Sequence, residues 1–311
     1  MSRIAADGAA SKKQQLFMKK CIMRLLIIFI IGAAAAAGIS AVICRSALTV
    51  REYELPLEGV ERPFTAVCVT DLHGRQFGRD NEKLLELIRA QQPDVIFTLG
   101  DLVGRGASDG EAARMGELLR ALREIAPVYS SLGNHEEDYM RIIGRDLRPG
   151  IRDAGAALLD EDCEIAEIAG SRICLGGTLG HLWPDGRSRE EFLSSPEYRL
   201  MERMQASGLP TVVLSHRPDT IIFEKAYENW DIDLFLSGHT HGGLIRLPLI
   251  GGLYAPKQGI FPRYDRGAFS LGRTRLLISG GFAGYGPFQR IFNRPEICVL
   301  RITPAEGSSH G

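Results

Sequence analysis

Hydrophobic positions along the chain predict a repeated alternation of strands and helices from about residue 63 onward. The apolar, β-branched run at 63–70 (PFTAVCVT) has the length of a strand, whereas residues 81–90 (NEKLLELIRA) carry apolar side chains at helical spacing. A second apolar run of strand length follows at 93–99 (PDVIFTL). This strand–helix–strand rhythm predicts parallel strands in an α/β fold.

Each predicted strand ends at a polar group. Helical spacing returns at 111–125, and three further apolar runs follow at 127–132 (PVYSSL), 211–216 (TVVLSH) and 233–243 (DLFLSGHTHGG). Five separate strands therefore finish at a histidine, an aspartate or an asparagine. Because α/β sheets form ligand sites beyond the carboxyl ends of their strands, we expect these polar side chains to meet in one site.

A different apolar segment precedes the alternating region. Residues 25–44 contain no charged side chain and are long enough to cross roughly 30 Å of hydrocarbon as a helix. Lysines and an arginine precede this run, so the positive-inside bias predicts a cytoplasmic N-terminus and an extracytoplasmic remainder after Cys44. We therefore expect a single-pass membrane anchor, with a cleaved secretory signal or a buried soluble helix as the alternatives.

Composition and charge narrow the class of protein. The 311 residues are 45% hydrophobic and 24% charged, as expected of a globular chain. The formal net charge of -1 provides no global basic field, so we expect no nucleic-acid partner. The six cysteines include no CxxC pair, and Cys68, Cys163, Cys174 and Cys298 stand singly among apolar residues, where small buried side chains are expected.

The polar groups at the strand ends are types that bind metal ions. Five of the seven histidines stand there, together with aspartate and asparagine residues, and no cysteine joins them. Imidazole, carboxylate and amide oxygen suit divalent ions such as Mn, Fe or Zn, whereas a structural zinc cage would be expected to use thiolates. Two such ions about 3.5–4 Å apart can activate a water molecule for in-line displacement at phosphorus. The predicted site is therefore a catalytic pair of divalent ions.

Five motifs, in this order, carry a family resemblance. They are DLH at 71–73, GDLVGRG at 100–106, GNHE at 133–136, LSH at 214–216 and GHTHGG at 238–243. Singly, each could be an ordinary turn after a strand. Together they resemble the calcineurin-like metallophosphoesterases. The segments at 254–267 (YAPKQGIFPRYDRG) and 295–302 (PEICVLRI) further resemble the membrane-anchored bacterial branch of that family.

The resemblance implies a role for each residue of the site. Asp71, His73 and His241 would hold one metal, whereas Asn134, His216 and His239 would hold the other, with Asp101 bridging the two. The catalytic residues would be His135, Asp101 and Asn134, of which His135 would contact the phosphate and either protonate the leaving oxygen or stabilise developing charge. Glu136 stands where the family often has an aspartate, which puts the orientation of His135 in doubt.

The resemblance also implies a four-layer αββα sandwich of two mixed sheets, preceded here by the N-terminal transmembrane helix. We divide the chain into a basic segment (1–24), the anchor (25–44), a linker with the first strand (45–62), the metallophosphoesterase domain (63–303) and a tail (304–311). The sequence carries no signal for an oligomeric state.

Other parts of the chain have less specific patterns. We expect a hairpin over 163–178, a surface helix over 187–204 and a structural rather than a substrate-binding role for His181. Aromatic and basic residues alternate through 252–295. Core packing is the favoured interpretation of that segment, and a rim at the membrane interface is the alternative.

The expected activity follows from the site and the resemblance. A hydroxide bridging two ions would hydrolyse phosphoester or pyrophosphate bonds, with a phosphodiesterase acting on lipid-linked or envelope substrates as the preferred hypothesis. The alternatives are a phosphomonoesterase acting on phosphoproteins or small metabolites and a non-catalytic binding protein with this fold.

Overall fold

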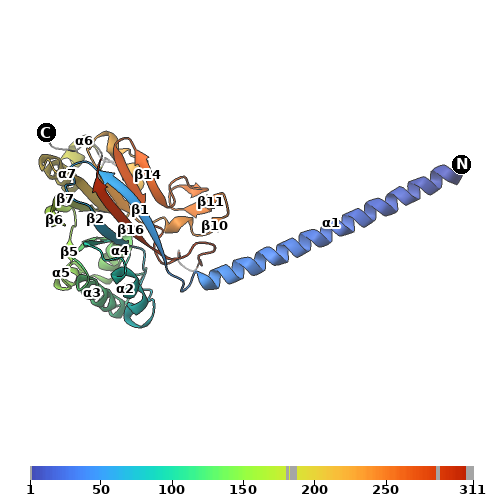
Figure 1. Cartoon of the computed structure of the whole chain (residues 1–311), viewed down its shortest axis with the longest axis horizontal. Helices are drawn as coiled ribbons and strands as arrows, with labels where there is room; N and C mark the ends of the chain where they lie inside the picture. The colour runs from blue at the N-terminus through green and yellow to red at the C-terminus, as the bar shows by residue number, and fades with distance from the viewer. Residues whose placement is uncertain (1, 180–181, 183–187, 285–287, 306–311) are drawn as a thin grey trace.

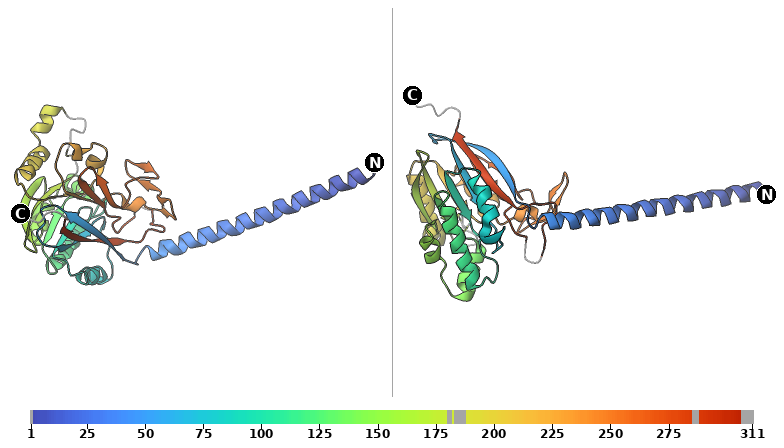
Figure 2. Two further views of the ribbon diagram at one scale, coloured as in Figure 1. Left: turned by 45° about the horizontal axis from the view of Figure 1, so that its top comes forward. Right: turned by 60° about the horizontal axis from the view of Figure 1, so that its bottom comes forward.

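The computed structural model describes residues 2–179, 182, 188–284 and 288–305, with side chains from residue 17 onward. Two six-stranded mixed sheets lie face to face, helices cover their outer faces, and one long helix projects from the domain (Figures 1 and 2). The predicted four-layer αββα sandwich is confirmed. His181 and the tail His310 lie outside the described residues.

The first sheet is formed by both ends of the domain. In spatial order its strands are β1 (Thr49–Leu57), β16 (Glu296–Pro304), β2 (Phe64–Val69), β3 (Val95–Leu99), β4 (Val128–Ser131) and β5 (Ala157–Leu158). The four strands from β2 to β5 are parallel, as the strand–helix–strand rhythm predicts. The last long strand, β16, runs antiparallel to β2 and parallel to β1.

The second sheet has a parallel centre with an antiparallel strand at each edge. Its strands are, in order, β14 (Gly267–Leu271), β15 (Thr274–Ile278), β9 (Leu234–Ser237), β8 (Thr211–Ser215), β7 (Ser171–Thr178) and β6 (Asp162–Ile168). The hairpin expected over 163–178 is confirmed as β6 and β7. Two short hairpins lie outside both sheets: β10 (Arg246–Leu247) with β11 (Gly251–Gly252), and β12 (Tyr254–Ala255) with β13 (Gly259–Ile260).

Helices occupy the outer layers and the connections. They are α1 (Ser2–Ile43), η1 (Arg79–Asn81), α2 (Glu82–Arg89), α3 (Asp109–Arg123), α4 (Asn134–Ile143), α5 (Arg148–Asp153), α6 (Arg189–Leu193), α7 (Pro196–Ala206), α8 (Asp219–Ile222), η2 (Ala226–Glu228) and η3 (His241–Gly243). The single helix expected over 187–204 is wrong. Ser195 caps α7 by accepting a hydrogen bond from the Tyr198 N–H, and Pro196 starts α7 at a position where no amide hydrogen is needed.

Three hydrophobic clusters fill the spaces between the four layers. Along β2, Ala66 and Cys68 face the cluster between the two sheets, whereas Val67 and Val69 face the cluster under α2 and α3. This two-residue period is the expected signature of a strand that is buried on both faces. The third cluster joins the outer face of the second sheet to α7 and α8. The strands from which the site residues emerge are therefore fixed by packing on both sides.

The cysteines behave as small apolar side chains. Cys68, Cys174 and Cys298 are buried, Cys163 is partly buried, and all six cysteines, each of which is described, are free thiols.

Most of the described apolar part of the N-terminal helix makes no contact with the rest of the domain. Its apolar part, Phe17–Ile43, has a mean hydropathy of 2.6, and only 6% of its most apolar window is buried. This helix could be a membrane span or a signal sequence. At its end Cys44 and Ser40 are buried against the domain.

The core-packing interpretation of the aromatic segment is wrong for most of its described rings. Phe282 is buried and Tyr264 and Phe269 pack against the third cluster, but the other four rings, Tyr254, Phe261, Phe288 and Phe292, are exposed. The reason is that these four rings lie on hairpins and loops outside the two sheets, where no further layer from the described residues covers them.

Candidate active site

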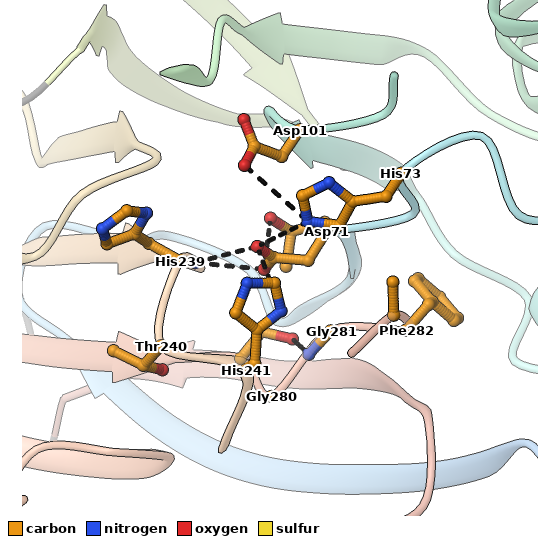
Figure 3. Close-up of polar contacts among 12 residues, drawn as sticks. Asp71, His73, Asp101, His239, Thr240, His241, Gly280, Gly281 and Phe282 are labelled. Carbon is orange, nitrogen blue, oxygen red and sulfur yellow. Dashed lines mark hydrogen bonds and ion pairs between the residues drawn. The ribbon is translucent and has the colours of Figure 1, made fainter. Parts of the chain in front are cut away.

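The predicted site residues come together where the carboxyl ends of strands from both sheets meet. Asp71 follows β2 and Asp101 follows β3, while His216 follows β8 in the other sheet. His216 Nδ1 lies 2.8 Å from the carbonyl oxygen of Leu99, to which its N–H donates, and this bond links the two sheets directly. Figure 3 shows Asp71, His73, Asp101 and His241 gathered together, while the His239 ring points away from them and its backbone N–H donates to Asp71.

The first cluster consists of Asp71, His73 and His241. Asp71 Oδ1 lies 3.8 Å from His73 Nε2 and 3.8 Å from His241 Nδ1. All three ligand atoms lie within 4.8 Å of one another, so they could hold a metal ion.

The second cluster consists of Asp101, His216 and His239. Asp101 Oδ2 lies 3.1 Å from His216 Nε2, which in turn lies 3.2 Å from His239 Nδ1. These three residues could also hold a metal ion.

Asp101 lies between the two clusters. Besides its contact with His216, Asp101 Oδ2 is 3.8 Å from His73 Nε2 and 3.7 Å from His135 Nε2. Its other oxygen, Oδ1, accepts a hydrogen bond of 2.8 Å from the backbone N–H of His135. A single carboxylate oxygen thus faces imidazoles of both clusters.

These distances suit metal coordination. Two ligands about 2.1 Å from one cation, separated by roughly 90–130°, are about 3.0–3.8 Å apart. Most of the contacts fall near the top of this range and are too long for hydrogen bonds. Within the described part of the chain, His73 Nε2 and Asn134 Oδ1 are buried without a hydrogen-bond partner. Buried polar atoms of this kind are expected at a metal site.

The charges of the two clusters are strongly coupled. Burial raises the pKa of Asp71 and Asp101, but the neighbouring histidines outweigh burial and hold both carboxyl pKa values well below their usual range. Burial alone lowers the pKa of His216, yet the Asp101 carboxylate raises it to about 9. Burial lowers the pKa of His239 to about 3 and that of His241 to about 4, so these two imidazoles are neutral and able to donate a lone pair.

The backbone at the site is strained. Asp71, His73, Asp101, His239 and His241 all have positive φ, between 49° and 69°. Side chains other than glycine rarely adopt this conformation, which costs on the order of 1 kcal/mol or more at each position. The surrounding packing must therefore hold these residues in place, and such strain gathers at functional sites.

Two glycines allow the strand ends to approach closely. A Cβ on Gly238 would lie 2.3 Å from Thr70 Oγ1 and 2.6 Å from Asp71 Oδ2. A Cβ on Gly133 would lie 2.3 Å from the Asp101 backbone nitrogen. A larger residue at either position would therefore keep these strand ends apart.

The sequence left the effect of Glu136 on the orientation of His135 in doubt, and the structure gives Glu136 another role. Its side chain turns back from the first turn of α4 and accepts four backbone hydrogen bonds: from Asp101 and Gly133 at Oε2, and from Leu102 and Val103 at Oε1. It therefore holds the loop that carries Asp101. A glutamate three residues after the helix N-cap is the sequence signal that points to this contact.

A second group that supports the site, Arg290 with Asn293, was not predicted from the sequence. Arg290, which the pattern grouped with a possible basic rim, is buried and donates to the carbonyl oxygens of Gly280, Ala283 and Asn293. Asn293 in turn donates to the carbonyl oxygen of His241 at 2.8 Å. This pair fixes the loop of the first cluster, and only the alternation of basic and aromatic residues hinted at it.

A groove of about 560 Å³ opens beside the clusters. It is lined by His73 and His135 from the site, by Arg105, and by Arg45 and Phe288 near the end of α1. This volume suits a small organic ligand. A larger cleft of about 700 Å³ lies between β1 and β15, around Glu54 and Arg273, and contains none of the predicted site residues.

The family is shown by comparison with known proteins. The model of the calcineurin-like phosphoesterase family matches residues 64–243. The chain is 29% identical over 247 residues to the phosphodiesterase YaeI of Escherichia coli, covering 77% of this chain and 82% of that protein. It is 36% identical over 288 residues to the UDP-2,3-diacylglucosamine pyrophosphatase LpxG of Chlamydia muridarum, covering 76% and 82% respectively.

Other relatives, from Campylobacter jejuni and Helicobacter pylori, are longer, and the chain spans 63% and 64% of their length. Among solved structures, TT1561 of Thermus thermophilus aligns with a TM-score of 0.44 at 14% identity, covering 70% of this chain and 90% of that one. The clusters of acidic and imidazole groups at the strand ends could hold metal ions, as is expected of a metallophosphoesterase. The chain belongs to the calcineurin-like phosphoesterase family and is an enzyme that acts on phosphoester bonds.

Proposed function

We propose that the chain is a binuclear-metal phosphodiesterase or pyrophosphatase that acts on lipid-linked substrates. Asp71, His73 and His241 would hold one divalent ion, and Asn134, His216 and His239 the other, with Asp101 shared between them. The observation that carries this assignment is the position of Asp101 Oδ2, which faces His73 of one cluster and His216 of the other.

The two ions, when bound, would supply a deprotonated water as the nucleophile and would neutralise charge on the phosphoryl oxygens. The protein's own groups set the geometry. Glu136 holds the Asp101 loop, and the hydrogen bond from His216 to Leu99 aims its Nε2 at Asp101. This second contact follows the usual way in which a backbone carbonyl orients a metal-binding imidazole.

His135 is assigned to the phosphate. Its Nε2 lies 3.7 Å from Asp101 Oδ2, and the ring packs 4.4 Å from that of His73, at the groove. Burial lowers the pKa of His135 below its usual value. A neutral imidazole donates a hydrogen bond but carries no extra proton at neutral pH, so this shift favours stabilisation of developing charge over protonation of the leaving group.

Two features support a lipid-linked substrate. The groove extends from His73 and His135 to Arg45, directly after the apolar helix. Two relatives, by their printed names, are a phosphodiesterase and a UDP-2,3-diacylglucosamine pyrophosphatase. We also propose that α1 anchors the chain with its N-terminus in the cytoplasm and the catalytic domain outside. A C-terminal alkaline phosphatase fusion that is inactive in intact cells would contradict this topology.

The test of function uses the full chain, purified in detergent and loaded with Mn²⁺. We expect two ions per chain by elemental analysis and faster hydrolysis of bis-p-nitrophenyl phosphate than of p-nitrophenyl phosphate. Asp101→Asn should lose metal and at least about 100-fold in activity, because a shared ligand serves both ions. Asp162→Asn, at an exposed carboxylate on β6, is the control and should change neither quantity.

Two results would contradict the proposal. A single ion per chain would rule out the binuclear site. A clear preference for the monoester would instead favour a phosphomonoesterase.

A further inference from the structure

Six large apolar side chains project from three loops beside the end of α1. They are Leu249, Ile250, Ile260, Phe261, Phe288 and Phe292, with exposed fractions from 45% for Phe292 to complete exposure for Leu249. We call this set the apolar rim. Leu249 and Ile250 lie at the tip of the β10–β11 hairpin, Ile260 and Phe261 at the β12–β13 hairpin, and the two phenylalanines in the loop before β16. Leu249, Ile250 and Phe292 line one surface hollow, and clustered apolar exposure of this kind marks an interaction surface.

The three loops form one connected unit. The Phe261 N–H donates to the Leu253 carbonyl oxygen at 2.9 Å, and the Leu253 N–H donates to Ile245 at 2.7 Å. The Arg246 N–H donates to Ile291 at 2.9 Å, which joins the first hairpin to the loop before β16. The apolar rim is therefore held by backbone hydrogen bonds in one arrangement.

The apolar rim is also fixed to α1. The Phe292 N–H donates to Ser40 Oγ at 2.6 Å, and the Arg294 guanidinium donates to the carbonyl oxygens of Ala47 and Leu48. Both views in Figure 2 show the hairpins on the side of the domain from which α1 leaves. Ser40 precedes Cys44 by about one helical turn, or roughly 6 Å along the axis. Phe292 thus lies level with the last turn of the apolar helix.

We propose that the apolar rim inserts into the interface of the lipid bilayer that α1 spans. This inference rests on the proposed anchor. A depth of roughly 6 Å below the end of the apolar run matches the boundary between head groups and acyl chains, where aromatic and aliphatic side chains are stabilised. Arg45, just after α1, and Arg294, which binds the backbone of Ala47 and Leu48, are exposed near this level, where lipid phosphates would lie. A bilayer is favoured over a protein partner because the surface is continuous with α1.

This placement has a consequence for the substrate. Phe288 belongs to the apolar rim and also lines the groove that leads to His73 and His135. The mouth of the groove then opens at the level of the head groups. A lipid phosphoester can reach the metal clusters while its acyl chains stay in the bilayer.

The test measures depth and uses the full chain reconstituted in vesicles of phospholipids brominated on their acyl chains. Phe261→Trp is compared with Ile165→Trp, an exposed apolar position on β6 at the far edge of the second sheet. The two native tryptophans are common to both variants. We expect bromine to quench the added fluorescence of Phe261→Trp at least twofold more than that of Ile165→Trp. Equal quenching would overturn the proposal, as would failure of the protein to float with the vesicles.

A second measurement separates membrane docking from catalysis. The double variant Ile260→Asp with Phe261→Asp should hydrolyse soluble bis-p-nitrophenyl phosphate at the wild-type rate, but vesicle-resident phosphodiesters at least tenfold more slowly. An unchanged rate on vesicles would overturn the proposal. Protection of the introduced tryptophan that grows with protein concentration would assign the apolar rim to a second copy of the chain, and would likewise overturn it. Quenching requires no turnover, so a failed activity assay leaves this readout intact.

Discussion

Replacement of Glu136 by glutamine tests how the Asp101 loop is held. The carboxylate accepts backbone hydrogen bonds of 2.8, 2.8, 2.8 and 3.1 Å, two at each oxygen. Burial and the nearby Asp101 carboxylate raise the pKa of Glu136, but four donors require a group that only accepts. In Glu136→Gln one oxygen becomes an NH₂ group, so two buried N–H donors lose their acceptor.

The magnitude follows from that count. Each buried unsatisfied donor costs about 1–3 kcal/mol, so the variant should be destabilised by roughly 2–6 kcal/mol. For a domain of this size, that corresponds to a fall in Tm of roughly 4–24 °C. Because the loop carries Asp101, we also expect the affinity for Mn²⁺ to fall by about 10–100-fold.

The assay is thermal unfolding of the full chain in detergent with and without Mn²⁺, together with metal titration. Glu137→Gln is the matched control, because the neighbouring side chain is exposed and its substitution should change Tm by less than about 2 °C. If Glu136→Gln matched that control in both Tm and metal affinity, the four hydrogen bonds would not hold the site, and the reasoning would be refuted.

Three further predictions follow from single contacts. Gly238→Ala should lose metal from the first cluster and about 1–3 kcal/mol of stability, because the new Cβ would lie 2.3 Å from Thr70 Oγ1. Elemental analysis and the Tm of this variant are compared with those of Gly150→Ala, where a Cβ meets no atom within 4 Å. Equal metal contents in the two variants would contradict the prediction. Metal binding at pH 7.5 should release at least about one proton, because the pKa of His216 is raised to about 9 and a metal-bound imidazole must be neutral. The affinity for metal should therefore fall as pH falls. Calorimetry in buffers of different ionisation enthalpy measures the release, and finding no released proton would refute the prediction. Glu161→Gln should stabilise the protein by up to about 3 kcal/mol at pH 8 but little at pH 5. Burial raises the pKa of Glu161 from 4.5 to about 7, so the folded state progressively loses stability as pH rises through that window. The same gain in Tm at both pH values would contradict this prediction.

Much of the fold was readable from the sequence because its signals are local. The two-residue period of β2 and the apolar spacing of α2 depend only on neighbouring residues, and both elements lie within two residues of their predicted bounds. The helix boundary between α6 and α7 was missed because Ser195 and Pro196 act at one point inside a continuous polar stretch.

By itself, the sequence determined which side chains could bind metal and that they follow five strands, since residue type and periodicity are properties of short segments. Only the tertiary structure decided that Glu136 holds the Asp101 loop, and that Arg290 is buried while Phe261 is exposed. These outcomes depend on which surfaces pack together in the folded chain, as where Glu136 contacts the backbone of Asp101, 35 residues away. Local pattern carries no information about that packing.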